Sequence, residues 1–277
     1  MFRAFINLLR FAIHAAATFV ACVVKEKRSE LLDIKGFERR GAQTLFQTHE
    51  NSFLEWNLYA ASVQTISMNS EFGFRFFTAE ERRAYIVCHF GARSRNIRAY
   101  DMLRDGAYKS DIFRLCVLFI EGGIYMDCKS ATIVPFKRII PRDSEFAMFI
   151  DTFDSRLSNG FIFATQQSKL IKELMDEALR RVLAREYGKN HLDIAGPEMF
   201  GTVVKQLLGI RRLVPGRYVY NGANVDLLGT SRLFDSFMCI GGKPVIKRQP
   251  DNYFFNLRRF LKRYEFSWIS RTSFIDS

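Results

Sequence analysis

The clearest pattern of hydrophobic and polar positions in the chain lies between residues 109 and 130. In its first half, apolar side chains recur at the spacing of one helix face, at Phe113, Cys116, Val117 and Ile120. Ser110 and Asp111 stand just before them. A short oxygen-bearing side chain can accept hydrogen bonds from the free N–H groups of a first helical turn. The pattern therefore predicts a helix that is capped at Ser110–Asp111.

Two adjacent glycines, Gly122 and Gly123, predict where this helix ends, because glycine adopts a positive φ without a steric cost. A short apolar run from Ile124 to Met126 follows and is typical of a buried strand. Asp127 comes next. In α/β proteins the carboxyl end of a strand opens onto the ligand crevice, so we expect this carboxylate at a binding site.

Strand and helix patterns alternate along the rest of the chain, which predicts an α/β sandwich. Period-two alternation marks a strand over residues 72–77, and Thr78 to Glu81 reads as the cap and first turn of a helix. Further elements are expected as strands at 131–135 and 146–150, a helix at 168–183, and a helix that opens at 195–198.

The N-terminal segment, residues 2–24, is mostly apolar but carries polar side chains along one helical stripe, at Arg3, Asn7, Arg10, His14 and Thr18. An interfacial amphipathic anchor, a signal anchor, a transit or signal peptide, and a helix docked on the domain all remain open. We expect membrane association through residues 2–24. The charge-rich stretch up to residue 41 reads as a linker, which leaves residues 42–277 as one domain.

Composition adds limits to this picture. The chain of 277 residues is 48% hydrophobic with 28 Phe, so a Phe-rich core is expected. Its net charge of +12 suits a soluble basic surface, an anionic substrate or an anionic membrane. It has no recognisable nucleic-acid motif, so we do not expect nucleic acid as a partner. Five scattered cysteines without a C-x-x-C pair argue against a zinc site.

The segment around Asp111 resembles the glycosyltransferase sugar-binding region that contains a DXD motif. That family combines S-D-x-x-R, a hydrophobic run, G-G-x-Y and D-x-D, and this chain matches with Ser110, Asp111, Arg114, Gly122, Gly123, Tyr125 and Asp127. It departs at Lys129, where the family has the last carboxylate of D-x-D. The chain looks like glycosyltransferase family 32, with its yeast initiating mannosyltransferases and capsular polysaccharide glycosyltransferases.

Three further segments extend the resemblance to about residues 43–208. Phe46-Gln47-Thr48-His49 resembles the first strand of the family, S-N-G-F-I-F-A over 158–164 resembles its sugar-facing segment, and Ala195-Gly196-Pro197-Glu198 corresponds to its T-G-P. The resemblance implies a GT-A type fold, with a Rossmann-like mixed sheet flanked by helices in a single catalytic domain.

The resemblance also implies roles for individual residues. Asp111 would bind hydroxyls of the donor sugar, Arg114 would orient Asp111 and the sugar, and Asp127 would contact the ribose or a metal, which makes these three the catalytic candidates. The other residues implied in donor binding are Gln47, Gly123, Tyr125 and Lys129. Those implied to face the sugar or the acceptor are Asn159, Gly160, Gly196 and Pro197.

A divalent cation, Mn²⁺ or Mg²⁺, is the cofactor that the resemblance implies, with Asp127 as its ligand. Lys129 conflicts with this, because a protonated amine has no lone pair to offer a cation. Three alternatives stay open: Asp127 holds the metal with the diphosphate and another acidic residue, Lys129 replaces the metal as a phosphate clamp, or the chain is inactive.

The sequence therefore predicts a glycosyltransferase that moves a hexose from a UDP- or GDP-sugar to a glycan or other hydroxyl acceptor, with retention. The alternative is an inactive glycosyltransferase-like module that binds a glycan or nucleotide. The Golgi residence usual in the family implies a type II membrane protein, while a cytoplasmic, viral or bacterial setting remains open.

Overall fold

A mixed seven-stranded sheet forms the centre of the fold in the computed structural model, which describes residues 31–152, 156–229, 237–248 and 270–275. The strands lie in the order β4 (Gly73–Phe77), β2 (Thr44–Thr48), β5 (Gly123–Met126), β8 (Arg156–Ala164), β7 (Phe146–Thr152), β10 (Ala223–Leu228) and β9 (Gly216–Tyr220).

The sheet contains both parallel and antiparallel strand pairs. β4, β2 and β5 run parallel, and β8 lies antiparallel between β5 and β7. β10 pairs parallel with β7, and β9 closes the edge antiparallel to β10. The α/β class and the mixed sheet flanked by helices, both predicted from the sequence, are confirmed.

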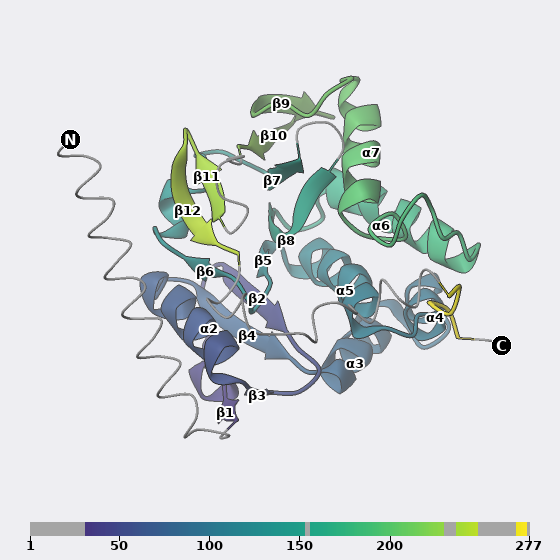
Figure 1. The fold of residues 1–277 in the computed structure, drawn as a ribbon, viewed down its shortest axis with the longest axis horizontal. Coiled ribbons are helices and arrows are strands. Elements are labelled where there is room, and N and C mark those ends of the chain that lie inside the picture. Colours follow the sequence, from purple (N-terminus) through teal and green to yellow (C-terminus); the bar gives the residue numbers. More distant parts are fainter. Residues whose placement is uncertain (1–30, 153–155, 230–236, 249–269, 276–277) are drawn as a thin grey trace.

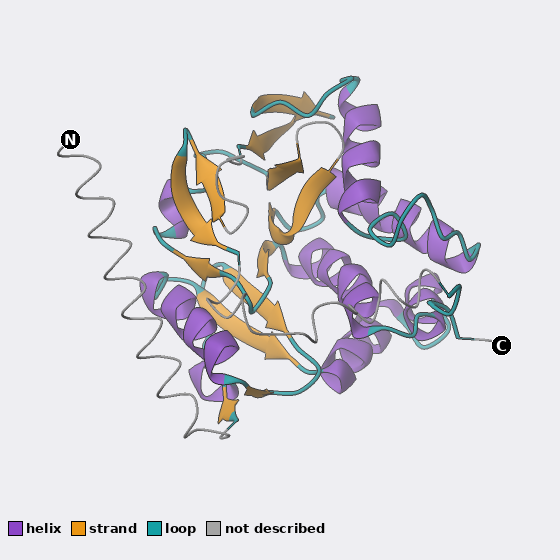
Figure 2. Ribbon diagram, in the orientation of Figure 1, coloured by secondary structure: helices purple, strands orange, loops and turns teal. Residues whose placement is uncertain are grey.

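Helices cover both faces of the sheet (Figures 1 and 2). One face packs against α3 (Ala79–Phe90), α4 (Arg95–Met102), α5 (Gly106–Glu121), α6 (Lys169–Leu183) and α7 (Pro197–Leu208). The other packs against α2 (Trp56–Met68) and a small sheet of β11 (Phe237–Ile240), β12 (Lys243–Lys247) and β6 (Ala131–Thr132). The remaining short elements are β1 (Leu32–Asp33), η1 (Lys35–Phe37), β3 (Phe53–Leu54) and η2 (Phe136–Arg138).

Two hydrophobic cores follow from this layering, because successive side chains of a strand point to opposite faces. On β5, Tyr125 faces the core beneath α5, whereas Ile124 and Met126 face the core beneath α2. The cores are rich in phenylalanine, as the composition predicts, with Phe46, Phe74 and eleven others among the buried side chains of the described residues.

Several predicted helix ends are confirmed. Thr78 and Glu81 form a reciprocal capping box at the start of α3, and Ser168 caps α6 through the N–H of Ile171. Pro197 occupies the first turn of α7, where its missing N–H costs nothing.

The predicted start of α5 is wrong. The helix begins at Gly106 after Asp105, so Ser110 and Asp111 lie inside it rather than at its cap. Ser110 donates its hydroxyl proton to the carbonyl oxygen of Ala107 at 2.7 Å, the backward bond of a serine within a helix. The sequence pattern did not predict this extra first turn, because it begins with Gly106 and glycine is a poor helix former. Its consequence is that Asp111 and Arg114 lie one turn apart on a continuous helix.

The glycine turn after α5 is confirmed. Gly122 and Gly123 adopt φ values of 67° and 96°. A Cβ on Gly123 would lie 2.5 Å from the carbonyl oxygen of Thr44, so the close approach of β5 to β2 requires a residue without a side chain.

Residues 31–41, which read as a linker, instead pack on the domain. Ile34 is fully buried, and the Arg39 guanidinium donates to the carbonyl oxygens of Phe72 and Ile66. The predicted membrane segment, residues 2–24, lies outside the described residues. Within the described ranges, no helix is both long enough and apolar enough to cross a membrane.

The core beneath α5 depends on Phe113, whose ring is fully buried against Phe77, 4.8 Å away between centroids, and Tyr85. We expect Phe113→Ala to lower the free energy of unfolding by about 3–5 kcal/mol, since it removes buried contacts and leaves a cavity. Urea denaturation measures this. Phe53→Ala is the matched control, because Phe53 is half exposed; its loss should stay near 0.5 kcal/mol. Equal losses in the two variants would contradict the assignment of Phe113 to the core.

Candidate active site

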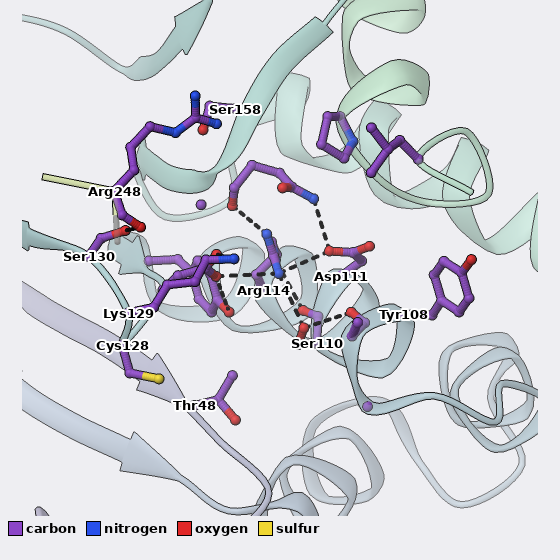
Figure 3. Close-up of a pocket in the computed structure, with 18 of the residues that line it drawn as sticks. Thr48, Tyr108, Ser110, Asp111, Arg114, Cys128, Lys129, Ser130, Ser158 and Arg248 are labelled. Atoms are coloured by element: carbon purple, nitrogen blue, oxygen red, sulfur yellow. Dashed lines mark hydrogen bonds and ion pairs between the residues drawn. The ribbon is translucent and has the colours of Figure 1, made fainter. Parts of the chain in front are cut away.

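A cavity of about 480 Å³ opens at the edge of the sheet where β2 and β5 end. This volume lies in the range of about 300–1,000 Å³ that is typical of ligand sites. The predicted site residues that line it are Asp111, Arg114, Tyr125, Asp127, Lys129, Asn159, Gly160 and Pro197. Figure 3 shows Asp111, Arg114 and Lys129 around the same space.

Strand register explains why residues so far apart in sequence meet here. Met126, the last residue of β5, pairs with Phe161 of the antiparallel β8, so the start of β8 lies beside the end of β5. The N–H of Asp127 donates to the carbonyl oxygen of Gly160 at 3.0 Å. A Cβ on Gly160 would lie 3.0 Å from the Asp127 carboxylate, so a larger residue there would press on that side chain.

Arg114 is the centre of the site and is almost fully buried. Its Nη2 lies 2.9 Å from Oδ1 of Asp111 and 3.7 Å from Oδ1 of Asp127, and its Nη1 donates to the carbonyl oxygen of Asn159. The guanidinium also lies 4.5 Å from the centroid of the Tyr125 ring. One cation thus ties α5 to the ends of β5 and β8.

The Asp127 carboxylate takes three neighbours from the protein. Oδ1 accepts a hydrogen bond from the Tyr125 hydroxyl at 3.2 Å and faces Arg114, while Oδ2 lies 3.3 Å from Nζ of Lys129. Burial favours the neutral acid, but Lys129 and Arg114 together outweigh it and hold the pKa of Asp127 below its usual range. Asp127 is therefore ionised at neutral pH.

Asp111 has the opposite electrostatic balance. Its Oδ1 accepts a hydrogen bond from the Asn159 side-chain amide at 2.9 Å and faces Arg114. Burial raises the pKa of Asp111 to about 7, with Asp127 adding to the rise and Arg114 and Lys129 opposing it. This carboxyl group exchanges its proton near neutral pH.

Three predicted site residues do not line the cavity. Gln47 is fully buried in β2, and neither its Nε2 nor its Oε1 has a hydrogen-bond partner. Gly123 lies at the opposite end of β5 from Asp127. Gly196 caps α7, where a Cβ would lie 2.9 Å from the carbonyl oxygen of Leu192 and 3.4 Å from Oδ2 of Asp111.

The sequence reading missed a buried cation at the end of β2. Arg82 of α3 is 1% exposed, donates to the hydroxyl oxygen of Thr48 at 3.0 Å, and pairs with Glu50 at 2.7 Å. His49 lines the cavity beside this pair, and burial lowers its pKa. Nothing in the helix pattern of residues 79–90 distinguishes Arg82 from the adjacent, exposed Arg83.

Arg248 was also missed. It follows β12, lines the cavity and pairs with Asp151 of β7. The Gly241-Gly242 pair is a sequence signal for a hairpin turn, and both glycines have a positive φ in the turn between β11 and β12. The equivalent signal of Asn221-Gly222 marks the turn between β9 and β10.

The side chains around the cavity do not fit a divalent cation such as Mn²⁺ or Mg²⁺. These ions prefer about six oxygen ligands. Each acidic residue that lines the cavity already faces a basic one, in the pairs Asp111–Arg114, Asp127–Lys129, Glu50–Arg82 and Asp151–Arg248. No group of three His, Cys, Asp or Glu residues comes together among the described residues. The predicted role of Asp127 as a metal ligand therefore lacks supporting side chains.

Comparison with known proteins supports the family predicted from the sequence. Residues 38–146 match the family model "Glycosyltransferase sugar-binding region containing DXD motif", and this span includes Asp111 to Lys129. No curated protein matches the chain significantly. A solved structure of PaToxG Glycosyltransferase is 18% identical, with a TM-score of 0.47, over 61% of this chain and 69% of that chain. Assignment to glycosyltransferase family 32 stays a prediction.

The raised pKa of Asp111 predicts a pH dependence of stability. The folded protein keeps a proton that the unfolded side chain, with a pKa of 3.8, has lost. The stabilisation is therefore fully present below the unfolded value and is lost as pH rises through about 7. We expect wild type to lose stability relative to Asp111→Asn between about pH 4 and about pH 7, as measured by urea denaturation. A difference that is constant with pH would contradict the raised pKa.

Proposed function

We propose, from the premise that residues 38–146 belong to the glycosyltransferase sugar-binding regions with a DXD motif, that this chain transfers a hexose from a nucleotide sugar to a hydroxyl acceptor. The observation that carries the proposal is the buried Asp111–Arg114–Asp127 network facing a cavity of ligand size. Buried charges that also face a cavity are typical of functional sites.

The donor sugar is expected against Asp111. The hydrogen bond from Asn159 and the ion pair with Arg114 both use Oδ1 of Asp111, which lines the cavity. Carboxylate oxygens accept hydrogen bonds from sugar hydroxyls. Arg114 and Asn159 fix the orientation of Asp111, so the sugar meets a group that is already ordered.

Departure of the nucleotide is the difficult step of the reaction. The bond between the anomeric carbon and the phosphate oxygen breaks, its electron pair goes to the diphosphate, and negative charge grows there. Preorganised positive charge lowers the barrier to such a step. Lys129, Arg248 and Arg156 line the cavity and supply positive charge of this kind.

The pairing of the acidic residues favours retention by front-face attack. A covalent mechanism needs a carboxylate poised as nucleophile, but the four acidic residues of the cavity wall are each engaged with a basic partner. In front-face attack the acceptor oxygen bonds to the anomeric carbon on the side the nucleotide leaves, and its proton passes to the departing phosphate. NMR of the anomeric configuration of the product tests this; an inverted product would contradict it.

A screen of UDP- and GDP-hexoses for hydrolysis and transfer tests the function. We expect turnover of at least one donor. Binding of nucleoside diphosphates without turnover of any common donor would instead favour the alternative, a glycosyltransferase-like module that has lost its chemistry.

Asp127→Asn should lower turnover by about a hundredfold or more, since it removes the charge that orders Lys129, Arg114 and Tyr125. The amide keeps the shape of the side chain, so the thermal transition should remain cooperative. Asp176→Asn is the control, because Asp176 lies exposed on α6 and pairs only with surface groups such as Lys172. Wild-type turnover in Asp127→Asn would refute this site assignment.

A further inference from the structure

Lys129 and Arg248 are brought to one wall of the cavity by the pairing of two short strands. β12 runs antiparallel to β6, with Lys247 opposite Ala131 and Ile246 opposite Thr132. The residue after β12 therefore lies next to the residue before β6, and the Ser130 hydroxyl donates to the carbonyl oxygen of Arg248 at 3.4 Å. In Figure 3 the Lys129, Ser130 and Arg248 side chains share one side of the cavity, away from Asp111.

Both cations are accessible from the cavity. The Lys129 side chain is 55% exposed, although its Nζ lies 3.3 Å from Asp127. Arg248 is 27% exposed, and its contact with Asp151 uses Nη2. A guanidinium carries five N–H donors and an ammonium carries three, so each group keeps donors for an anion while it remains paired.

We propose that Lys129 and Arg248 bind the diphosphate of the donor directly and take the place of a divalent cation. This rests on the proposed function only for the choice of a nucleoside diphosphate as ligand. A metal would need oxygen ligands from the protein, and the Asp127 carboxylate that would supply them faces Lys129, Arg114 and the Tyr125 hydroxyl instead.

The chemistry of the two groups suits a diphosphate. The guanidinium is planar and binds phosphate oxygens in pairs, while the ammonium acts as a compact point charge. Asp127 pairs with Lys129 at the end of β5, and Asp151 pairs with Arg248 on the same wall, so both cations are partly positioned before the ligand arrives. A cavity built this way binds its ligand without first recruiting a metal.

Isothermal titration of the full chain with UDP and with GDP, in EDTA and in MnCl₂, tests the inference. We expect wild type to bind at least one of them in EDTA, with little gain from Mn²⁺. Lys129→Ala and Arg248→Ala should each weaken binding in EDTA by about ten- to a hundredfold, the effect of losing a hydrogen bond to a charged group. Lys137→Ala and Arg83→Ala are matched controls on exposed surfaces outside the cavity, and should bind as wild type does.

Lys129→Asp exchanges the cation for a carboxylate next to Asp127. It should abolish binding in EDTA and make binding depend on MnCl₂. Wild-type binding that requires Mn²⁺, or a Lys129→Asp variant with the wild-type metal profile, would overturn the inference. Circular dichroism melting confirms that each variant is folded.

The outcome separates this inference from the proposed function. Metal-independent binding without turnover would leave the cation pair intact and refute the transferase. Turnover and nucleotide binding that are both lost in EDTA would support the transferase and refute the role of the cation pair.

Discussion

Burying a guanidinium costs several kcal/mol unless its charge and its donors are matched, and this requirement shapes the site around Arg114. Asp111 lies one turn before it on α5, Asp127 follows β5, and the Asn159 carbonyl belongs to β8. All three elements must hold their register for the charge to be satisfied. The glycine turn after α5 and the antiparallel pairing of β5 with β8 therefore serve the same end, since each sets the position of one partner of Arg114.

The same network separates the two carboxyl groups electrostatically. Asp127, between Lys129 and Arg114, has a depressed pKa and is always charged near neutrality, whereas burial raises the pKa of Asp111 to about 7. Two acids on one cavity wall can thus differ in charge because of their surroundings alone. One offers a fixed negative charge that orders neighbouring cations, and the other can both donate and accept a hydrogen bond.

Local patterns in the sequence predict much of this fold because they depend on neighbouring residues. The capping box at Thr78, the glycine turn and the helix at 169–183 are examples. The grouping of Asp111, Arg114 and Asp127 was implied instead by the family resemblance, because it depends on contacts between separate elements. The start of α5 and the buried position of Gln47 were not predicted correctly, since tertiary packing overrides weak local preference. Arg82 and Arg248 were not predicted as site residues, because their place in the cavity depends on contacts with residues distant in the sequence.

The pairing of β12 with β6 also has a consequence for the order of folding. The hydrogen bond from Ser130 to Arg248 joins positions 118 residues apart, whereas the hairpin of β11 and β12 forms from neighbouring residues. Contacts between distant segments carry a larger loop-closure entropy and tend to form later than local ones. The hairpin of β11 and β12 is therefore expected to form before β12 docks on β6. A nascent chain would acquire its Arg114 network before its cavity is complete.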